Sequence, residues 1–167
     1  MANFYIEGPF DIPCEHKAAA RVIQHKDFWK QADVQPFADE KGCYVFAVRA
    51  GKGYTPIYVG KATKTFKQEC FNASNRHKYA SGLADYKRGS PLMFLVLHPK
   101  KKGKTNAKQI GEIEDFLIQN ASVKNPDLQN SKGKSGPKWS IDGVIRAKNG
   151  KPSKAASIFK KVFNFDK

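Results

Sequence analysis

Two tyrosines on either side of an expected turn are the residues of this sequence that best suit chemistry. Tyr44 follows Gly42 and Cys43, and Tyr58 lies two residues before Gly60. If the two short segments are neighbouring strands, both phenol groups point into one cleft. A phenol hydroxyl can donate or accept a hydrogen bond, and it can lose its proton. The pair therefore suggests chemistry on a phosphate group.

The spacing of turn-forming residues predicts a β-hairpin around these tyrosines. We expect a strand over residues 43–49, a loop over 50–56 and a return strand over 57–59. Side chains alternate along a strand, so Tyr44 faces one side of the sheet and Val45 faces the other. Both sides of the first strand are apolar. It is therefore expected to be a central strand, covered on both faces.

Apolar periodicity and turn residues predict further elements around the hairpin. A third strand, apolar on both faces, is expected over residues 92–98. Strands with intervening helices indicate an α/β protein. The other expected elements are a short strand at 4–6, a helix that includes 18–23, helical pieces at 66–71 and from 75, a short strand at 139–145, and a last helix capped by Ser153.

A helix is expected from a cap at Thr105 or Asn106 to about residue 120, and it directs one acid toward the sheet. At about 100° per residue, its apolar stripe consists of Ile110, Ile113, Leu117 and Ala121. Glu114 falls inside this stripe, whereas Glu112 and Asp115 point to the solvated side. A buried carboxylate is costly unless it is paired or bound to a cation. Glu114 is therefore expected either to form an ion pair with a lysine or arginine or to hold a metal ion.

The charge of the chain favours a polyanionic partner. Its 167 residues include 30 Lys plus Arg against 15 Asp plus Glu, a formal charge of +15. The lysines cluster around residues 100–108 and 124–138. Nucleic acid is the leading candidate, and a merely solubilising surface is the alternative.

The cysteines and the apolar runs indicate a cytoplasmic protein without membrane contact. Cys14, Cys43 and Cys70 are scattered and form no Cys-x-x-Cys pair, which argues against a disulfide framework and a structural zinc site. The longest apolar run, residues 92–97, is far shorter than the roughly 20 residues of a spanning helix. The N-terminal residues lack a hydrophobic signal core.

The order of these residues resembles the GIY-YIG nuclease domain family. Gly42-Cys43-Tyr44 resembles its first motif, Tyr58-Val59-Gly60 its second, Glu114 its helical carboxylate and Asn130 the asparagine that follows. The resemblance covers about residues 42–130 and implies a small central antiparallel β-sheet flanked by helices. We expect an N-terminal accessory segment at 1–40, a GIY-YIG-like catalytic domain at 41–131, and a basic loop with a C-terminal extension at 132–167.

One position departs from the family pattern. The family places an arginine on the helix after the second motif, but residues 65–70 contain none. Lys67 is the nearest cation, and Arg76 lies farther along the chain. Arg76 is slightly favoured, because a planar guanidinium grips phosphate oxygens with two hydrogen bonds.

The resemblance implies a division of roles. Glu114 would hold one Mg²⁺ or Mn²⁺ ion. Tyr44 would be the general base, which requires that cations such as Lys61 lower its pKa from about 10. Tyr58 would orient water or phosphate. Asn130 would form a hydrogen bond with Tyr58 or with the backbone near the site.

The sequence thus predicts a Mg²⁺-dependent DNA endonuclease of the restriction, defence or mobile-element kind. An alternative is a GIY-YIG-like module that binds nucleic acid without cleaving it, and a third is a basic protein associated with RNA. A double-strand cut would need two sites and hence a dimer or sequential nicking. No strand edge or helix face in the sequence announces a dimer.

Overall fold

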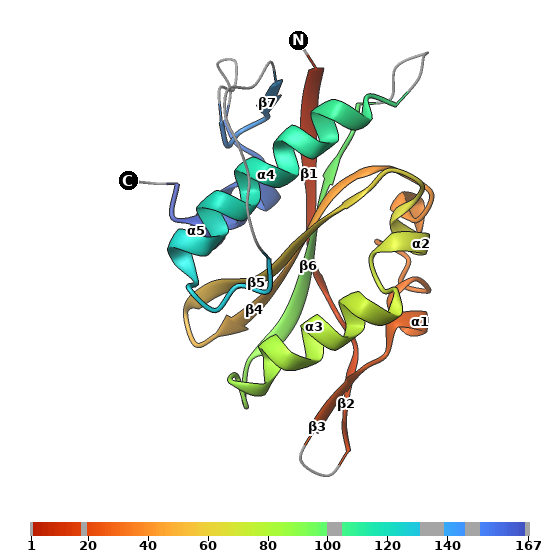
Figure 1. Ribbon diagram of the computed structural model, residues 1–167, viewed down its shortest axis with the longest axis vertical. Helices are drawn as coiled ribbons and strands as arrows, with labels where there is room; N and C mark the ends of the chain where they lie inside the picture. The colour runs from red at the N-terminus through yellow and green to blue at the C-terminus, as the bar shows by residue number, and fades with distance from the viewer. Residues whose placement is uncertain (1, 18–19, 100–104, 131–138, 146–150, 166–167) are drawn as a thin grey trace.

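A five-stranded sheet forms the centre of the protein in the computed structural model (Figure 1). The structure describes residues 2–17, 20–99, 105–130, 139–145 and 151–165. Within these residues the strand order is β5-β4-β6-β1-β7. The strands are β1 (Ala2–Asp11), β4 (Gly42–Ala50), β5 (Gly53–Ala62), β6 (Ser90–Leu97) and β7 (Trp139–Ile141). Strands β5, β4, β6 and β1 pair antiparallel with their neighbours, and β7 pairs parallel to β1. The coarse prediction of an α/β fold with a central antiparallel sheet is confirmed.

Helices cover both faces of this sheet (Figure 1). The helices on one face are α1 (His25–Phe28), α2 (Phe66–Glu69) and α3 (Ala73–Ala84), with the 3₁₀ turn η1 (Gln35–Phe37) nearby. The helices on the other face are α4 (Ala107–Lys124) and α5 (Lys154–Phe163). The first face carries most of the aromatic rings, whereas the second carries mainly aliphatic side chains and the phenylalanines of α5.

Strand β4 is central and buried on both faces, as predicted. Tyr44 belongs to the core beneath α3, and Val45 belongs to the core beneath α4. Its partner β5 is longer than expected. Residues 54–56, expected in a loop, pair with β4, and the turn consists only of residues 51–52. Pro56, which has no backbone N–H group, is tolerated in the hairpin because β5 is an edge strand and the register shifts at this point.

The segment before β4 differs most from the expectations. The short strand expected at residues 4–6 is part of the ten-residue β1, which pairs with β6 inside the sheet. The boundary expected after residue 40 therefore does not separate this segment from the sheet. The helix expected over 18–23 is wrong for the described part, because residues 20–23 form strand β3 against β2 (Cys14–Lys17). Val22 and Ile23 are β-branched and favour a strand.

The helices agree better with the expectations. Helix α4 begins after Asn106, one of the two predicted caps, whose side chain accepts a hydrogen bond from the Gln109 N–H. The apolar stripe of α4 is fully buried. Helix α5 begins after Ser153, as predicted. Helix α3 begins two residues earlier than expected because Asn72 caps it. The basic loop expected over residues 132–138 lies outside the described residues.

Candidate functional site

Tyr44 owes its position to the glycine opposite it on β5. Tyr44 pairs in register with Gly60, and its ring stands over that residue. A Cβ atom at Gly60 would lie 2.4 Å from both Cζ and Oη of Tyr44. The requirement for glycine is therefore one of space, since any side chain would displace the ring. The glycine of the second motif thus determines where the phenol of the first motif lies.

A buried asparagine holds the Tyr44 hydroxyl. The side-chain Nδ2 of Asn75, which is 4% exposed, donates a hydrogen bond of 2.7 Å to Tyr44 Oη. The same Nδ2 lies 2.9 Å from the carbonyl oxygen of Glu69 and 3.3 Å from that of Cys70. The backbone N–H of Asn75 donates to the capping side chain of Asn72. The first turn of α3 therefore fixes the position of the Tyr44 hydroxyl oxygen.

The second tyrosine lies beside the first. The ring centroids of Tyr44 and Tyr58 are 6.3 Å apart, and the rings are inclined by 46°. The ammonium group of Lys78, from α3, lies 4.6 Å from the Tyr58 ring centroid in a cation–π contact. Tyr79, the next residue of α3, stacks on Phe46 at 4.0 Å. The sheet and α3 therefore bring two phenols and one ammonium group together.

Glu114 forms the ion pair that its position on α4 suggested. Its Oε2 lies 2.8 Å from Lys61 Nζ, with the Glu114 side chain 15% exposed and that of Lys61 48% exposed. A Cβ atom on Gly111, one turn earlier, would be 4.0 Å from Lys61 Nζ, so the lysine crosses α4 where a side chain is missing. The hydrogen bond with Glu114 raises the pKa of Lys61.

Burial raises the pKa of both tyrosines. For Tyr44 the negative charges of neighbouring groups, including Glu114, act in the same direction, and the hydrogen bond from Asn75 opposes them. For Tyr58 the charge of Glu114 is the second cause after burial. The expectation that cations such as Lys61 lower the Tyr44 pKa is wrong for the protein alone, because burial raises that pKa and Lys61 is paired with Glu114. Both phenols are therefore neutral at neutral pH.

Asn130 forms the backbone contact that was predicted for it. Its side-chain Oδ1 accepts a hydrogen bond of 2.8 Å from Val59 N–H, and its Nδ2 donates one of 2.6 Å to Val59 C=O. The next N–H group toward the N-terminus, that of Gln129, donates to Ile57 C=O. Residues 129–130 thus pair with the open edge of β5 on either side of Tyr58.

The two cations considered for the family's arginine, Arg76 and Lys67, lie on α3 and α2. Arg76 is exposed on α3, and its charge helps to lower the pKa of His25. Lys67 is exposed on α2, where its backbone N–H donates to Ala38 C=O. The cation that lies over the Tyr58 ring is Lys78. Neither Lys78 nor Asn75 was predicted as a site residue. Asn75 lies one helical turn before the aromatic Tyr79, so both residues lie on the same face of α3, and this spacing could have indicated that Asn75 faces the sheet.

None of three comparisons, with protein families, with curated proteins and with solved structures, finds a match to this chain. The GIY-YIG resemblance therefore rests on the residues quoted for it. Among the described helices, none has the length and apolar character needed to cross a membrane.

The donor set for a metal ion is small. The described residues contain no group of three or more His, Cys, Asp or Glu side chains able to hold an ion. Glu114 offers one hard carboxylate oxygen at a partly open position, where Lys61 now supplies the positive charge. Mg²⁺ often binds one or two carboxylates, several waters and a substrate phosphate. Glu114 fits such an ion as a single protein ligand that needs substrate and water to complete the site.

Proposed function

We propose that this chain is a metal-dependent endonuclease of the GIY-YIG type that hydrolyses phosphodiester bonds in DNA. The observations that support it most are that Tyr44 and Tyr58 lie side by side, with ring centroids 6.3 Å apart, and that Glu114 of α4 is paired at 2.8 Å with Lys61 of β5, the strand that carries Tyr58. The net charge of +15 would attract the polyanionic substrate.

Glu114 would hold the Mg²⁺ or Mn²⁺ ion. When bound, such an ion relieves negative charge on the phosphate that is attacked. The Lys61 ammonium occupies Glu114 Oε2 in the protein alone, so it must move when a second cation takes that oxygen. Once released, Lys61 is free to contact a phosphate oxygen, because its side chain is already half exposed.

The two tyrosines would orient the reacting groups. The Tyr44 hydroxyl is buried, accepts a hydrogen bond from Asn75 and donates one of 3.5 Å to the Glu69 carbonyl oxygen, so it would donate to a phosphate or water only once substrate binding opens this position. Any transfer of a proton to Tyr44 requires that substrate binding first lower the raised pKa of that phenol. Lys78, on the Tyr58 ring, adds positive charge to the same side. Asn130 would keep this stretch of β5 straight through its two hydrogen bonds with Val59.

Nicking of supercoiled plasmid with Mg²⁺, with Mn²⁺ and with a chelator tests the proposal. We expect Glu114→Gln to reduce the nicking rate at least about 100-fold, which is about 2.7 kcal/mol of activation free energy. Glu112→Gln, two residues away on the same helix, is the matched control and should retain the wild-type rate. Thermal unfolding of both variants separates lost chemistry from lost folding. Equal nicking by Glu114→Gln and the wild type contradicts the proposal.

A module that binds nucleic acid without cleaving it is the second candidate. The Lys61–Glu114 ion pair and the raised pKa values of both tyrosines favour it, because the carboxylate is already paired and neither phenol is ionised in the protein alone. A wild-type chain that binds DNA but is inert with both metal ions supports this candidate. Competition with RNA measures the preference between nucleic acids. In either case the affinity should fall steeply with salt, because lysine and arginine contacts release counterions.

A further inference from the structure

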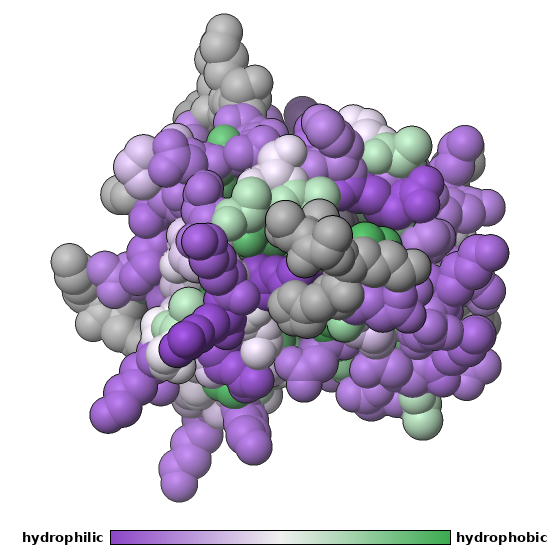
Figure 2. Space-filling model, turned by 90° about the horizontal axis from the view of Figure 1, so that it is seen from below, coloured by the Kyte–Doolittle hydropathy of each residue, from purple (hydrophilic) through white to green (hydrophobic). Residues whose placement is uncertain are grey.

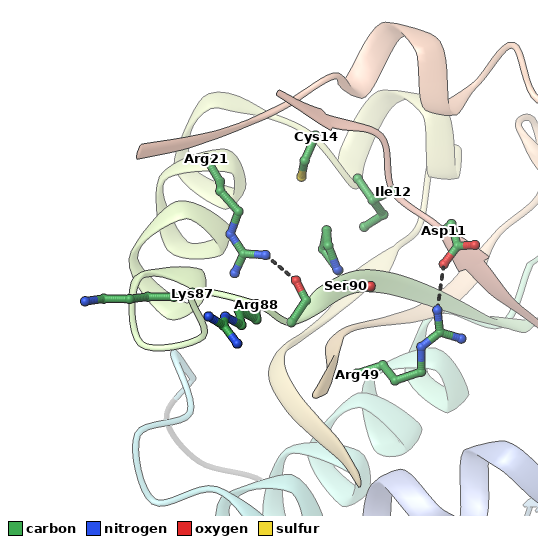
Figure 3. A pocket seen from close by; sticks show the side chains of 10 residues that line it. Asp11, Ile12, Cys14, Arg21, Arg49, Lys87, Arg88 and Ser90 are labelled. Carbon is green, nitrogen blue, oxygen red and sulfur yellow. Dashed lines mark hydrogen bonds and ion pairs between the residues drawn. The ribbon is translucent and has the colours of Figure 1, made fainter. Parts of the chain in front are cut away.

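A basic pocket of about 370 Å³ lies at the other end of β4 from Tyr44 (Figure 3). We define it by its charged lining, which consists of Arg21, Arg49, Lys87, Arg88 and Asp11. Four cations and one acid give this lining a formal charge of +3. The end of the molecule that contains β2, β3 and the turn before β6 is largely hydrophilic (Figure 2).

Among the described residues, the guanidinium of Arg21 is bound by neutral acceptors rather than by a carboxylate. Its guanidinium donates hydrogen bonds to the carbonyl oxygens of Leu83, Tyr86 and Gly89, at the end of α3 and in the turn that follows. These acceptors are neutral, and the end of a helix carries only about half a negative charge. These hydrogen bonds therefore hold Arg21 in place without neutralising its charge.

The single acid of the basic pocket neutralises little of the remaining charge. Asp11 Oδ1 lies 3.9 Å from Arg49 Nη2, and the two side chains are 74% and 45% exposed. An exposed pair at that distance is weak. Lys87 and Arg88 are also exposed, and Figure 3 shows the Lys87 side chain extending away from the centre of the pocket. Arg49 and Arg88 thus keep hydrogen-bond donors available for an incoming anion.

The turn that carries Lys87 and Arg88 is firmly packed. Gly89 is buried and donates its N–H to Tyr86 C=O. A Cβ atom on Gly89 would lie 2.4 Å from Val48 Cγ2, so the turn packs directly on β4. The hydrogen bonds from Arg21 fix the same turn from the β3 side. The cations around the pocket are therefore attached to a backbone that need not reorganise on binding.

We propose that the basic pocket binds a phosphate group. Arginine forks match phosphate oxygens with paired hydrogen bonds, and the volume is within the usual range of ligand pockets. The phosphate belongs either to a nucleic-acid backbone or to a free phosphorylated molecule. Tyr44 and Arg49 are five residues apart on β4, about 17 Å, so the pocket is separate from the tyrosine site and does not depend on nuclease activity.

NMR titration of the full chain, labelled with ¹⁵N, tests this proposal. The observed signals are the backbone amides of Gly89 and Ser90, which line the pocket. The probes are inorganic phosphate, a thymidine monophosphate and a 12-base-pair duplex, each added at constant ionic strength. The test variant combines Arg49→Gln with Arg88→Gln, and Arg21 is left intact because its hydrogen bonds hold the turn. The control variant combines Lys26→Gln with Lys154→Gln, two exposed cations outside the pocket.

We expect saturable shifts of the Gly89 and Ser90 amides with at least one probe, and an affinity at least about tenfold weaker in the test variant. The control variant should bind like the wild type, and so should Glu114→Gln, which separates this site from the proposed nuclease. Saturation by either small probe identifies a free phosphorylated ligand, and saturation by the duplex alone identifies a backbone phosphate. Absence of saturable shifts with all three probes, or equal binding by the test variant, overturns the proposal.

Discussion

The two ends of β4 hold polar groups in opposite ways. Near its start, Tyr44 is 2% exposed, its hydroxyl is fixed by a buried asparagine, and burial raises its pKa. Near its end, Arg49 is half exposed and belongs to an open pocket with three further cations. At the first end, water is excluded and the pKa values of the phenols rise. At the second end, charge stays in contact with water.

This difference indicates where substitutions should matter. A buried polar group depends on each neighbour, because a lost hydrogen bond cannot be replaced by water. A solvated cation depends little on its neighbours, so its removal changes ligand binding far more than folding. Substitutions at the tyrosine end should therefore lower the stability of the fold, whereas substitutions in the basic pocket should lower only the affinity for a ligand.

The largest effect is expected for Gly60→Ala. The new Cβ atom would overlap the Tyr44 ring, so the free energy of unfolding should fall by about 3 kcal/mol, the upper part of the usual range for overpacking. Urea denaturation measures this change. Gly111→Ala is the matched control. It lies in a helix, where a new Cβ atom would meet only Lys61 Nζ at an ordinary contact distance of 4.0 Å, and the change should stabilise the protein by up to about 1 kcal/mol. Equal stability of the two variants would contradict the packing seen here.

The next effect is expected for Asn75→Ala. It removes the donor to Tyr44 Oη and to the Glu69 carbonyl oxygen within a buried region, which should cost about 2 kcal/mol. Ser74→Ala, at the exposed neighbouring position of α3, should change stability by less than about 0.5 kcal/mol. Chemical denaturation of both variants checks the difference, and a cost at Asn75 no larger than at Ser74 would show that the buried hydrogen bonds contribute nothing.

A smaller effect follows from the raised pKa of Tyr44. The unfolded phenol titrates near pH 10 and the folded one higher, so the neutral form is favoured by folding. This contribution to stability is complete below pH 10 and is lost as the pH rises toward the folded pKa. Tyr44→Phe should therefore show a shallower decline of unfolding free energy above pH 10 than the wild type. Parallel pH profiles for the two proteins would refute the raised pKa.

The smallest effect is expected at the basic pocket. Arg49→Gln removes one exposed cation and a 3.9 Å contact with Asp11. The free energy of unfolding, measured by urea denaturation, should therefore change by less than about 0.5 kcal/mol. Asp11→Asn should be equally mild. A loss above 2 kcal/mol in Arg49→Gln would show that the two ends of β4 are not as different as described.

Local patterns predicted the elements that lie within one stretch of chain. The buried stripe of α4, the caps at Asn106 and Ser153, and the central position of β4 all follow from periodicity and hydrogen-bonding side chains. Glu114 could be placed near the sheet for the same reason. Asn130 was placed only by resemblance, since nothing in its neighbourhood announces a partner on β5.

Long-range pairing was beyond the sequence. β1 pairs with β6, some eighty residues later, and no local signal specifies that register. The contact of Lys78 with the Tyr58 ring was not predicted either, because it depends on how α3 is rotated against the rings of the sheet. The pKa values of the two tyrosines are raised chiefly by burial. The sequence shows the lysines near the tyrosines but not the depth at which the rings are buried, so it predicted a lowered pKa instead.

The pairing of β1 with β6 also decides how the chain can be shortened. A fragment that starts at Gly42 would lack the strand that covers one side of β6. Residues 92–97, apolar throughout and now fully enclosed, would become an open strand edge able to pair with other molecules. Aggregation of such a fragment would reflect this missing cover, and the N-terminal strand must accompany the two tyrosine motifs in any shortened protein.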